Sequence, residues 1–546
     1  MDSYFVGVDV GTGSVRAALV TRNGKVLQVS SKDTKTWSPR PGYFEQSSDD
    51  IWEAVCCVVK EVTKNVDDNA VKGIGFDATC SLVVVDAEGL PLSVSPTGKD
   101  EQNVILWLDH RAHAEAAFIN SLQHAVLQYV GGKISLEMET PKLLWLKRNL
   151  RQQCWDRVGY FFDLPDFLTW RATGADSRSL CSLVCKWTYE AHPNGNKGWS
   201  EDYFQQIGLS DLMECNWKKI GSVAKAPGAP CGRGLTDRAA RELGLPCGTS
   251  VGTSIIDAHA GGLGMIGCSA DVVSEDFHTR LSLICGTSTC HMALSKQPLF
   301  VEGVWGPYYS AMVPGYWLNE GGQSATGKLV DHVIDTHPAT AQVRIKIGKD
   351  VHIQQYLHNL LVDMAQKQGL ESISELTSSI HVWPDFHGNR SPLADSSLLG
   401  MICGLTLSAD EDNLALVYLA TLQALAYGTR HIVDVLRAAG HSEVRSLLIC
   451  GGLSRSPLFV QTQADVADLP VLCPCETESV LVGAAILGAC AAGVFPDVCT
   501  AIRMMGGAAD IVWPRQHEHR YHEKKYKVFL KMVEHQKEYR SIMSKN

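Results

Sequence analysis

Two short segments, half a chain apart, repeat the same strand–turn–strand pattern. The first is YFVGVDVGTGSVRAALV, which begins at Tyr4, and the second is TRLSLICGTSTCHMALS, which begins at Thr279. In each, an apolar run leads into a turn of glycine and hydroxyl residues, and a second strand-like run follows. Gly286 in the second turn corresponds to Gly11 in the first, and half of the chain separates them. A repeat at that spacing predicts two related domains rather than a short-repeat solenoid.

The elements around each copy alternate between strand and helix patterns. After the first copy come a hairpin turn at Asn23-Gly24, another strand, and a helix pattern over 48–65. In the second half a long helix pattern over 411–440 precedes the buried strand and glycine turn VRSLLICGG. This alternation predicts α/β architecture with mixed sheets. A helical insertion is expected from Thr336 onward.

The length of the chain, 546 residues, exceeds what one hydrophobic core supports, so we expect two domains of roughly 250 residues. The glycine-rich stretch between Gly261 and Phe277 is the expected boundary. We therefore predict an N-terminal domain over 1–265, a C-terminal domain over 270–500, and an extension over 501–546 that contains a charged amphipathic helix.

The composition excludes several classes of function. A net charge of -10 and a pI near 6.0 argue against a nucleic-acid or anionic-membrane surface and suit a small-molecule enzyme. The 18 cysteines include no CxxC pair, and positions such as Cys181 and Cys185 give no zinc spacing. We interpret most of them as reduced core residues of a cytoplasmic protein without a signal peptide.

The longest uncharged run, SVLVGAAILGACAAGVFP, starts at Ser479 and is short and dilute in large apolar residues for a membrane span. Its glycines at 483, 488 and 493 favour a buried helix that packs closely against a neighbour. No membrane association is expected.

The first turn is not one of the two common nucleotide motifs. A dinucleotide fingerprint requires a glycine at the position of Arg16 and a helix after it, whereas SVRAALV favours a strand. A P-loop requires Gly-Lys-Ser/Thr, which is absent. A hairpin whose backbone amides face a phosphate remains, with Asp9 placed to hold Mg²⁺. The alternative is a tight hairpin whose glycines only permit a positive φ.

The second turn and a third glycine pair strengthen the phosphate interpretation. Gly286-Thr287-Ser288 repeats the glycine-hydroxyl turn, so two turns facing each other could hold both ends of a triphosphate. Gly451-Gly452 follows a buried strand, and glycine there lets a flat ring lie against the backbone. The next helix is expected to begin between Ser454 and Pro457.

Several further segments carry a resemblance to a known family, in the family's order along the chain. They are ILWLDHRA (105–112), KLLWLKRN (142–149), GLPCGTSVGTSIIDAHAGGLG (244–264), PDFHGNRSPLADSSLLGMICGLTL (384–407) and GGLSRSPLFVQTQADV (451–466). With the two hairpins, they resemble the FGGY carbohydrate kinases of the sugar-kinase, Hsp70 and actin superfamily. The resemblance implies two RNase H-like (actin-like ATPase) α/β domains flanking a deep cleft, with ATP as co-substrate and Mg²⁺ as cofactor.

The resemblance also implies roles for individual residues. Asp257, which ends a short apolar strand and opens a helix of small residues, matches the family's general base and, with Asp9, lies near Mg²⁺. The alternative is a simple helix N-cap. His259 either touches substrate or packs in the wall of the site. The expected ATP and phosphate contacts are Gly11, Thr12, Gly13, Ser14, Arg16, Gly286, Thr287, Ser288, Gly322, Gly451, Gly452 and Ser456.

Sugar contacts are expected from the N-terminal domain. Alternation along a strand would place Trp107, Asp109 and Arg111 on one face, which suits a polyol; the alternative is an ion pair that covers a core tryptophan. The segments GIGFDATCS (73–81) and SLVCKWTYE (182–190) resemble the ribulokinase branch of the family. The expected substrate contacts are Asp77, Thr79, Cys80, Trp107, Asp109, Arg111, Lys186 and Asp257.

The resemblance therefore implies an ATP-dependent pentulose kinase that converts D-ribulose to D-ribulose 5-phosphate, with a sugar and ATP as its partners, and the composition predicts no nucleic-acid or membrane partner. Ribitol, L-ribulose and D-xylulose remain alternative substrates. An actin- or Hsp70-like ATPase and a non-catalytic sugar-binding protein are alternative classes. No oligomeric state is predicted.

Overall fold

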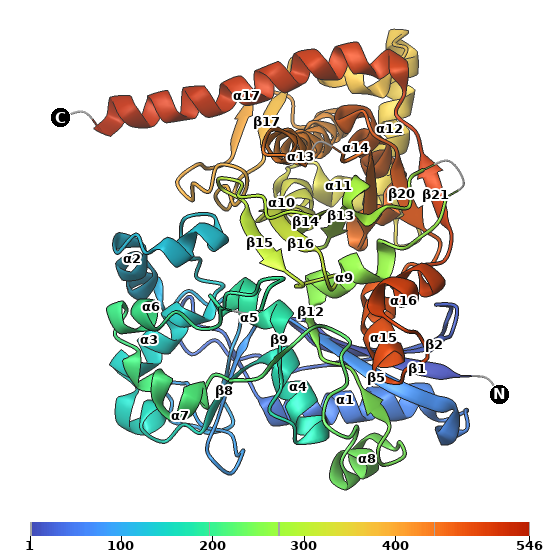
Figure 1. Ribbon diagram of the computed structural model, residues 1–546. Helices are drawn as coiled ribbons and strands as arrows, with labels where there is room; N and C mark the ends of the chain where they lie inside the picture. The colour runs from blue at the N-terminus through green and yellow to red at the C-terminus, as the bar shows by residue number, and fades with distance from the viewer. Residues whose placement is uncertain (1–2, 196, 271–272, 442, 545–546) are drawn as a thin grey trace.

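The computed structural model describes residues 3–195, 197–270, 273–441 and 443–544 (Figure 1). The chain forms two α/β halves: the N-terminal half occupies the lower part of Figure 1 and most of the C-terminal half the upper part. Each half is built on one mixed sheet. Within these ranges no helix combines the length and the apolar character that a membrane crossing requires.

The N-terminal sheet has the strand order β11-β5-β1-β2-β3, and β12 pairs with β5 beside β11. Strands β1, β2 and β3 form an antiparallel meander, whereas β5 runs parallel to β1. The bounds are β1 Tyr4–Val10, β2 Ser14–Thr21, β3 Val26–Asp33, β5 Val71–Ala78, β11 Ser250–Val251 and β12 Ile255–Ile256.

The C-terminal sheet has the order β15-β16-β14-β13-β19-β20-β21 and repeats that topology. Strands β13, β14 and β16 form an antiparallel meander, and β19 runs parallel to β13. The predicted duplication is confirmed, because β13–β14 and β19 occupy the places of β1–β2 and β5. The bounds are β13 Arg280–Cys285, β14 Thr289–Ser295, β15 Trp305–Tyr309, β16 Trp317–Gln323, β19 Ser446–Cys450, β20 Val471–Pro474 and β21 Ala509–Val512.

The remaining strands of the described residues form three small sheets. One has the order β4-β7-β6-β8, and the others pair β9 with β10 and β17 with β18. Their bounds are β4 Glu45–Gln46, β6 Leu82–Val85, β7 Val104–Ile105, β8 Tyr160–Asp163, β9 Arg178–Ser179, β10 Ala224–Lys225, β17 His381–Trp383 and β18 Met401–Cys403.

The helices confirm the predicted alternation, including the helix patterns at 48–65 and 411–440 and the helical insertion after Thr336, which becomes α11 and α12. Their bounds are α1 Ser48–Thr63, α2 His113–Ser121, α3 Glu139–Asn149, α4 Leu164–Thr173, α5 Leu180–Lys186, α6 Glu201–Gln206, α7 Glu214–Trp217, α8 Asp237–Leu243, α9 Asp257–Met265, α10 Gly327–Thr336, α11 Thr340–Ile347, α12 Ile353–Gln368, α13 Glu411–Ala438, α14 Pro457–Ala467, α15 Ser479–Ala491, α16 Val498–Met505 and α17 Gln516–Ser544.

Helix α15 joins the two halves, because it comes from the second half of the chain and packs against β1, β5 and α9 of the first (Figure 1). The approach is too close for side chains: a Cβ on Gly483 would lie 2.0 Å from the carbonyl oxygen of Ala260, and one on Gly75 1.9 Å from that of Ala484. The predicted close packing is confirmed at Gly483 and Gly488. It is wrong at Gly493, which follows the helix with a φ of +68° and open space around it.

The C-terminal helix α17 is confirmed as an amphipathic element. Its apolar face packs on the second half, where the ring of Phe529 lies 4.5 Å from that of Trp383. Tyr526 and Met532 are buried in the same cluster. The side chains of His517 and His519 are about half exposed, at 53% and 48%.

Candidate active site

Three carboxylates meet at the carboxyl ends of parallel strands in the N-terminal sheet. Strands β1 and β5 pair in a register that sets Asp9 opposite Asp77. Strand β12 pairs with β5 at the same level, so that Asp257, the first residue of α9, arrives at the same edge. The pairing register thus brings together three acids that lie far apart in the sequence.

The negative charge of these three carboxylates is only partly balanced by positive side chains beside them. Burial, Asp9 and Asp257 together raise the pKa of Asp77 well above its ordinary value. Neither of its carboxylate oxygens has a hydrogen-bond donor among the described residues. Burial and Asp9 raise the pKa of Asp257 from 3.8 to about 6, although the amide of Ala258 donates to its Oδ1 at 2.7 Å. An under-compensated cluster of oxygen ligands fits a hard divalent cation such as Mg²⁺.

Asp9 has a cationic partner in the neighbouring strand. Arg16 donates to its Oδ2 from Nε at 3.0 Å and from Nη2 at 2.5 Å, and its Nη1 donates to Glu478 at 2.9 Å. The guanidinium therefore ties the first hairpin to the residue that precedes α15. Its predicted phosphate contact stays a prediction.

The two hairpin turns are closed by the same backbone hydrogen bond. Gly11 donates from its amide to the carbonyl of Ser14 at 3.0 Å, and Gly286 donates to that of Ser288 at 2.9 Å. None of Gly11, Gly13 and Gly286 adopts a positive φ, and a Cβ on Gly13 would meet nothing within 4 Å. Backbone strain therefore does not explain these glycines, which removes the alternative of a hairpin that needs them for its φ.

The other predicted nucleotide contacts described in this region are Gly322, Gly451, Gly452 and Ser456, all from the C-terminal half. Gly451 has a φ of +94° and lies against Cys285, so the turn after β19 requires glycine, whereas Gly452 faces open space. Ser456 caps α14, because its Oγ accepts from the amide of Phe459 at 3.4 Å. Gly322 on β16 lies beneath the side chain of Arg390.

The predicted strand through Trp107, Asp109 and Arg111 is wrong. Strand β7 ends at Ile105 and a turn follows, because the carboxylate of Asp109 accepts from the amide of Arg111 at 2.9 Å and from that of Phe44 at 2.6 Å. A side chain that satisfies local amides in this way competes with a strand ladder.

The turn separates the three side chains. Asp109 and Arg111 form a fully buried ion pair at 2.8 Å, and Arg111 also binds Glu45 at 2.9 Å. Trp107 is partly exposed and donates from Nε1 to Thr12 Oγ1 in the first hairpin at 3.1 Å. Of the three, Trp107 is the one that contacts the first hairpin turn.

The other predicted sugar contacts lie along the same edge. Thr79 and Cys80 follow β5 directly and are buried, and Thr79 Oγ1 lies 3.0 Å from Ser81 Oγ. Lys186 ends α5 and faces the C-terminal half, where its Nζ lies 4.4 Å from the ring centre of Trp305. Its Nζ is also 3.8 Å from Glu137.

Sequence reasoning missed two charged residues that complete this region. They are Glu320 on β16 and Arg390, which form a buried ion pair. The Oε2 atom of Glu320 lies 3.6 Å from His259 Nε2, and this oxygen accepts no hydrogen bond in the described part of the chain. Burial alone would raise the pKa of Glu320, but the charges of Lys186 and Arg390 bring it below its ordinary value. An ionisable residue inside the apolar strand pattern WLNEGGQ was the available signal.

Comparisons with known proteins show the family to which this chain belongs. The FGGY family of carbohydrate kinases is matched by its N-terminal domain over residues 4–264 and by its C-terminal domain over 281–492. The chain is 55% identical over 551 residues to the FGGY carbohydrate kinase domain-containing protein of Homo sapiens, covering 100% of this chain and 98% of that one. It is 39% identical over 522 residues to a D-ribulokinase of Saccharomyces cerevisiae, covering 90% and 72%.

The fold matches a solved structure over nearly its whole length. The xylulose kinase from Rhodospirillum rubrum superposes with a TM-score of 0.78 at 20% identity, covering 98% of this chain and 99% of that one. The predicted fold class, a two-domain α/β sugar kinase of the actin-like type, is confirmed.

Proposed function

Because the chain belongs to the FGGY family of carbohydrate kinases, we propose that it transfers the γ-phosphoryl group of ATP to the C5 hydroxyl of D-ribulose. The observation that carries the proposal is the meeting of Asp257 with Asp9 and Asp77 at the sheet edge beside the first hairpin. The choice of D-ribulose is supported by the 39% identity to a D-ribulokinase over most of the chain.

Asp257 is the proposed general base. With a pKa of about 6 its carboxylate is ionised at neutral pH, yet it is basic enough to accept a proton from a hydroxyl group. The hydroxyl oxygen forms a bond to the γ-phosphorus while the bond from that phosphorus to the bridging oxygen of ADP breaks. When bound, Mg²⁺ supplies positive charge to the phosphate oxygens, and Asp9 and Asp257 are the residues that would hold it.

The hairpins and the buried charges position the reactants. The backbone amides within the two turns, at Gly13 and Thr287, are proposed to bind phosphate oxygens from the two halves. Trp107 and Lys186 offer an aromatic face and a cation to the sugar, whose hydroxyl groups can accept hydrogen bonds from the cation. The exclusion of water by the two halves would limit hydrolysis of ATP.

The proposal is tested by a panel of D-ribulose, L-ribulose, D-xylulose and ribitol with MgATP, followed by ADP release. D-Ribulose is expected to give the highest kcat/KM. A value for another sugar about tenfold higher would overturn the substrate assignment while leaving a sugar kinase. ADP release that does not depend on any sugar would favour an ATPase, and sugar binding without turnover would favour a sugar-binding protein.

A further inference from the structure

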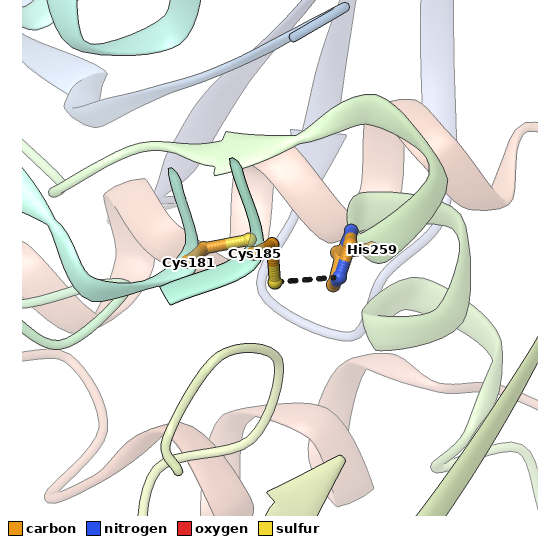
Figure 2. A group of neighbouring side chains, drawn as sticks. All are labelled: Cys181, Cys185 and His259. Atoms are coloured by element: carbon orange, nitrogen blue, oxygen red, sulfur yellow. Dashed lines mark hydrogen bonds between the residues drawn. The ribbon is translucent and has the colours of Figure 1, made fainter. Parts of the chain in front are cut away.

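Cys181, Cys185 and His259 form a buried cluster between α5 and α9 (Figure 2). The two cysteines are four positions apart on α5, so their side chains lie on the same face of the helix. His259 is the third residue of α9, and its Nε2 lies 3.5 Å from Cys185 Sγ. The two sulfur atoms and an imidazole nitrogen all lie within 4.8 Å of one another.

The cluster is sealed from solvent. The cysteines have no exposed surface and His259 is 1% exposed. The three side chains therefore contact one another and other buried residues rather than water. A polar group buried in this way is costly unless it has a hydrogen-bond or metal partner. The Nδ1 atom of His259 has none among the described residues.

A fourth atom that could bind a metal ion, a carboxylate oxygen, lies next to the cluster. The Oε2 atom of Glu320 is 3.6 Å from His259 Nε2, is buried, and accepts no hydrogen bond within the described residues, whereas Oε1 of the same carboxylate is held by Arg390. Arg390 therefore fixes the carboxylate and leaves one oxygen beside the histidine. This unpartnered oxygen is an observation independent of the two cysteines.

The chemistry of these donors selects one kind of ligand. Two thiolates, one imidazole and one carboxylate form a set that binds zinc tetrahedrally, whereas Mg²⁺ and Ca²⁺ take oxygen ligands. In an ideal zinc site two sulfur atoms are separated by ~3.8 Å, so side-chain movements of about 1 Å would bring the two cysteines and His259 to the spacing of zinc ligands. Two thiolates and Zn²⁺ together are neutral, and the carboxylate is balanced by Arg390, so such a site carries little net charge into the interior.

We propose that Cys181, Cys185 and His259 bind one zinc ion, with Glu320 at the fourth position. The ion would fix α5 to the start of α9. Lys186 follows Cys185 directly, and Asp257 precedes His259 by two positions. A metal at this point would therefore set the spacing of two proposed active-site residues without taking part in phosphoryl transfer.

The test is the metal content of the full-length protein after expression in zinc-supplemented medium. The wild-type protein is expected to contain about one zinc ion per chain, and Cys181→Ser and Cys185→Ser are expected to contain almost none. Cys154→Ser is the matched control, because Cys154 is equally buried but lies outside the cluster and is expected to leave the zinc content unchanged.

A second measurement does not depend on the stability of the variants. Wild-type protein stripped of zinc with a chelator and loaded with Co²⁺ is expected to show thiolate-to-cobalt charge-transfer absorption and the visible bands of a tetrahedral site. Wild-type protein that holds no zinc and gives no such spectrum would overturn the proposal, as would zinc retained in the double variant Cys181→Ser/Cys185→Ser.

Discussion

Replacing Asp257 by asparagine is expected to abolish turnover and at the same time to stabilise the fold. The substitution preserves shape, and Oδ1 of the asparagine still accepts from the amide of Ala258. What is lost is the basic oxygen that accepts the proton of the sugar, so kcat should fall at least ~100-fold. The folded state becomes more stable, because asparagine carries no negative charge at a position where burial and Asp9 disfavour one.

The size of the gain follows from the shift in pKa. Ionised Asp257 has a pKa raised from 3.8 to about 6, which corresponds to a penalty of about 3 kcal/mol in the folded state at pH 8. The wild-type protein therefore carries no penalty for Asp257 below pH 3.8, where the carboxyl group is protonated in both the folded and the unfolded state. Its free energy of unfolding decreases as the pH rises from 3.8 to 6, and the full penalty is present above pH 6. The advantage of asparagine should therefore be largest at pH 8 and about half as large at pH 5.

The assay is urea unfolding of both proteins in magnesium-free buffer at pH 8 and pH 5, beside steady-state kinetics with D-ribulose. Added Mg²⁺ should shrink the difference, because it stabilises the wild-type carboxylates more than the variant. In the wild-type enzyme kcat/KM should fall about tenfold per pH unit below pH 6. A variant that is less stable at pH 8, or that turns over near the wild-type rate, would refute the reasoning.

Three further substitutions probe other parts of the structure. Asp109→Asn should lower the free energy of unfolding by about 3 kcal/mol in urea, because the buried Arg111 loses one of its two carboxylate partners and keeps only Glu45. Gly483→Ala should lower the melting temperature, since its Cβ would stand 2.0 Å from the Ala260 carbonyl oxygen, an overpacking that costs at least ~1–3 kcal/mol; an unchanged melting temperature would contradict the close packing of α15. Gly13→Ala should leave thermal stability unchanged but raise the KM for ATP several-fold; an unchanged KM would argue against a phosphate site there.

Much of the secondary structure of the two halves could be predicted from local sequence patterns. The two hairpins, the turn at Asn23-Gly24, the strand before Asp257 and the buried helix α15 each have a periodicity or a glycine pattern confined to a few neighbouring residues. Such patterns report local backbone preference, which the fold preserves where packing agrees with it. The duplication was readable for the same reason, because each copy carries its pattern within one short segment.

The parts that escaped prediction depend on long-range contacts. The strand expected through Trp107 failed because the carboxylate of Asp109 satisfies nearby amides and turns the chain. Glu320 meets Lys186 and His259 only through the packing of the two halves, and no spacing in the sequence encodes that meeting.

The cysteines illustrate the same limit of local patterns. Cys181 and Cys185 lack the spacing of a zinc motif, and their third partner, His259, lies far along the chain on another helix. Helix α5 supplies one face and α9 the other, so only the tertiary structure brings the donors together.

The most direct test of the proposed function is the identity of the product formed from D-ribulose and MgATP, followed by ³¹P and ¹³C nuclear magnetic resonance. The wild-type protein should form one phosphate monoester, with carbon–phosphorus coupling at C5 and an equal amount of ADP, and Asp257→Asn should form it at least ~100-fold more slowly at the same protein concentration. Phosphorylation at another carbon, or ADP formed without a sugar phosphate, would contradict the assignment of this chain as a D-ribulose kinase.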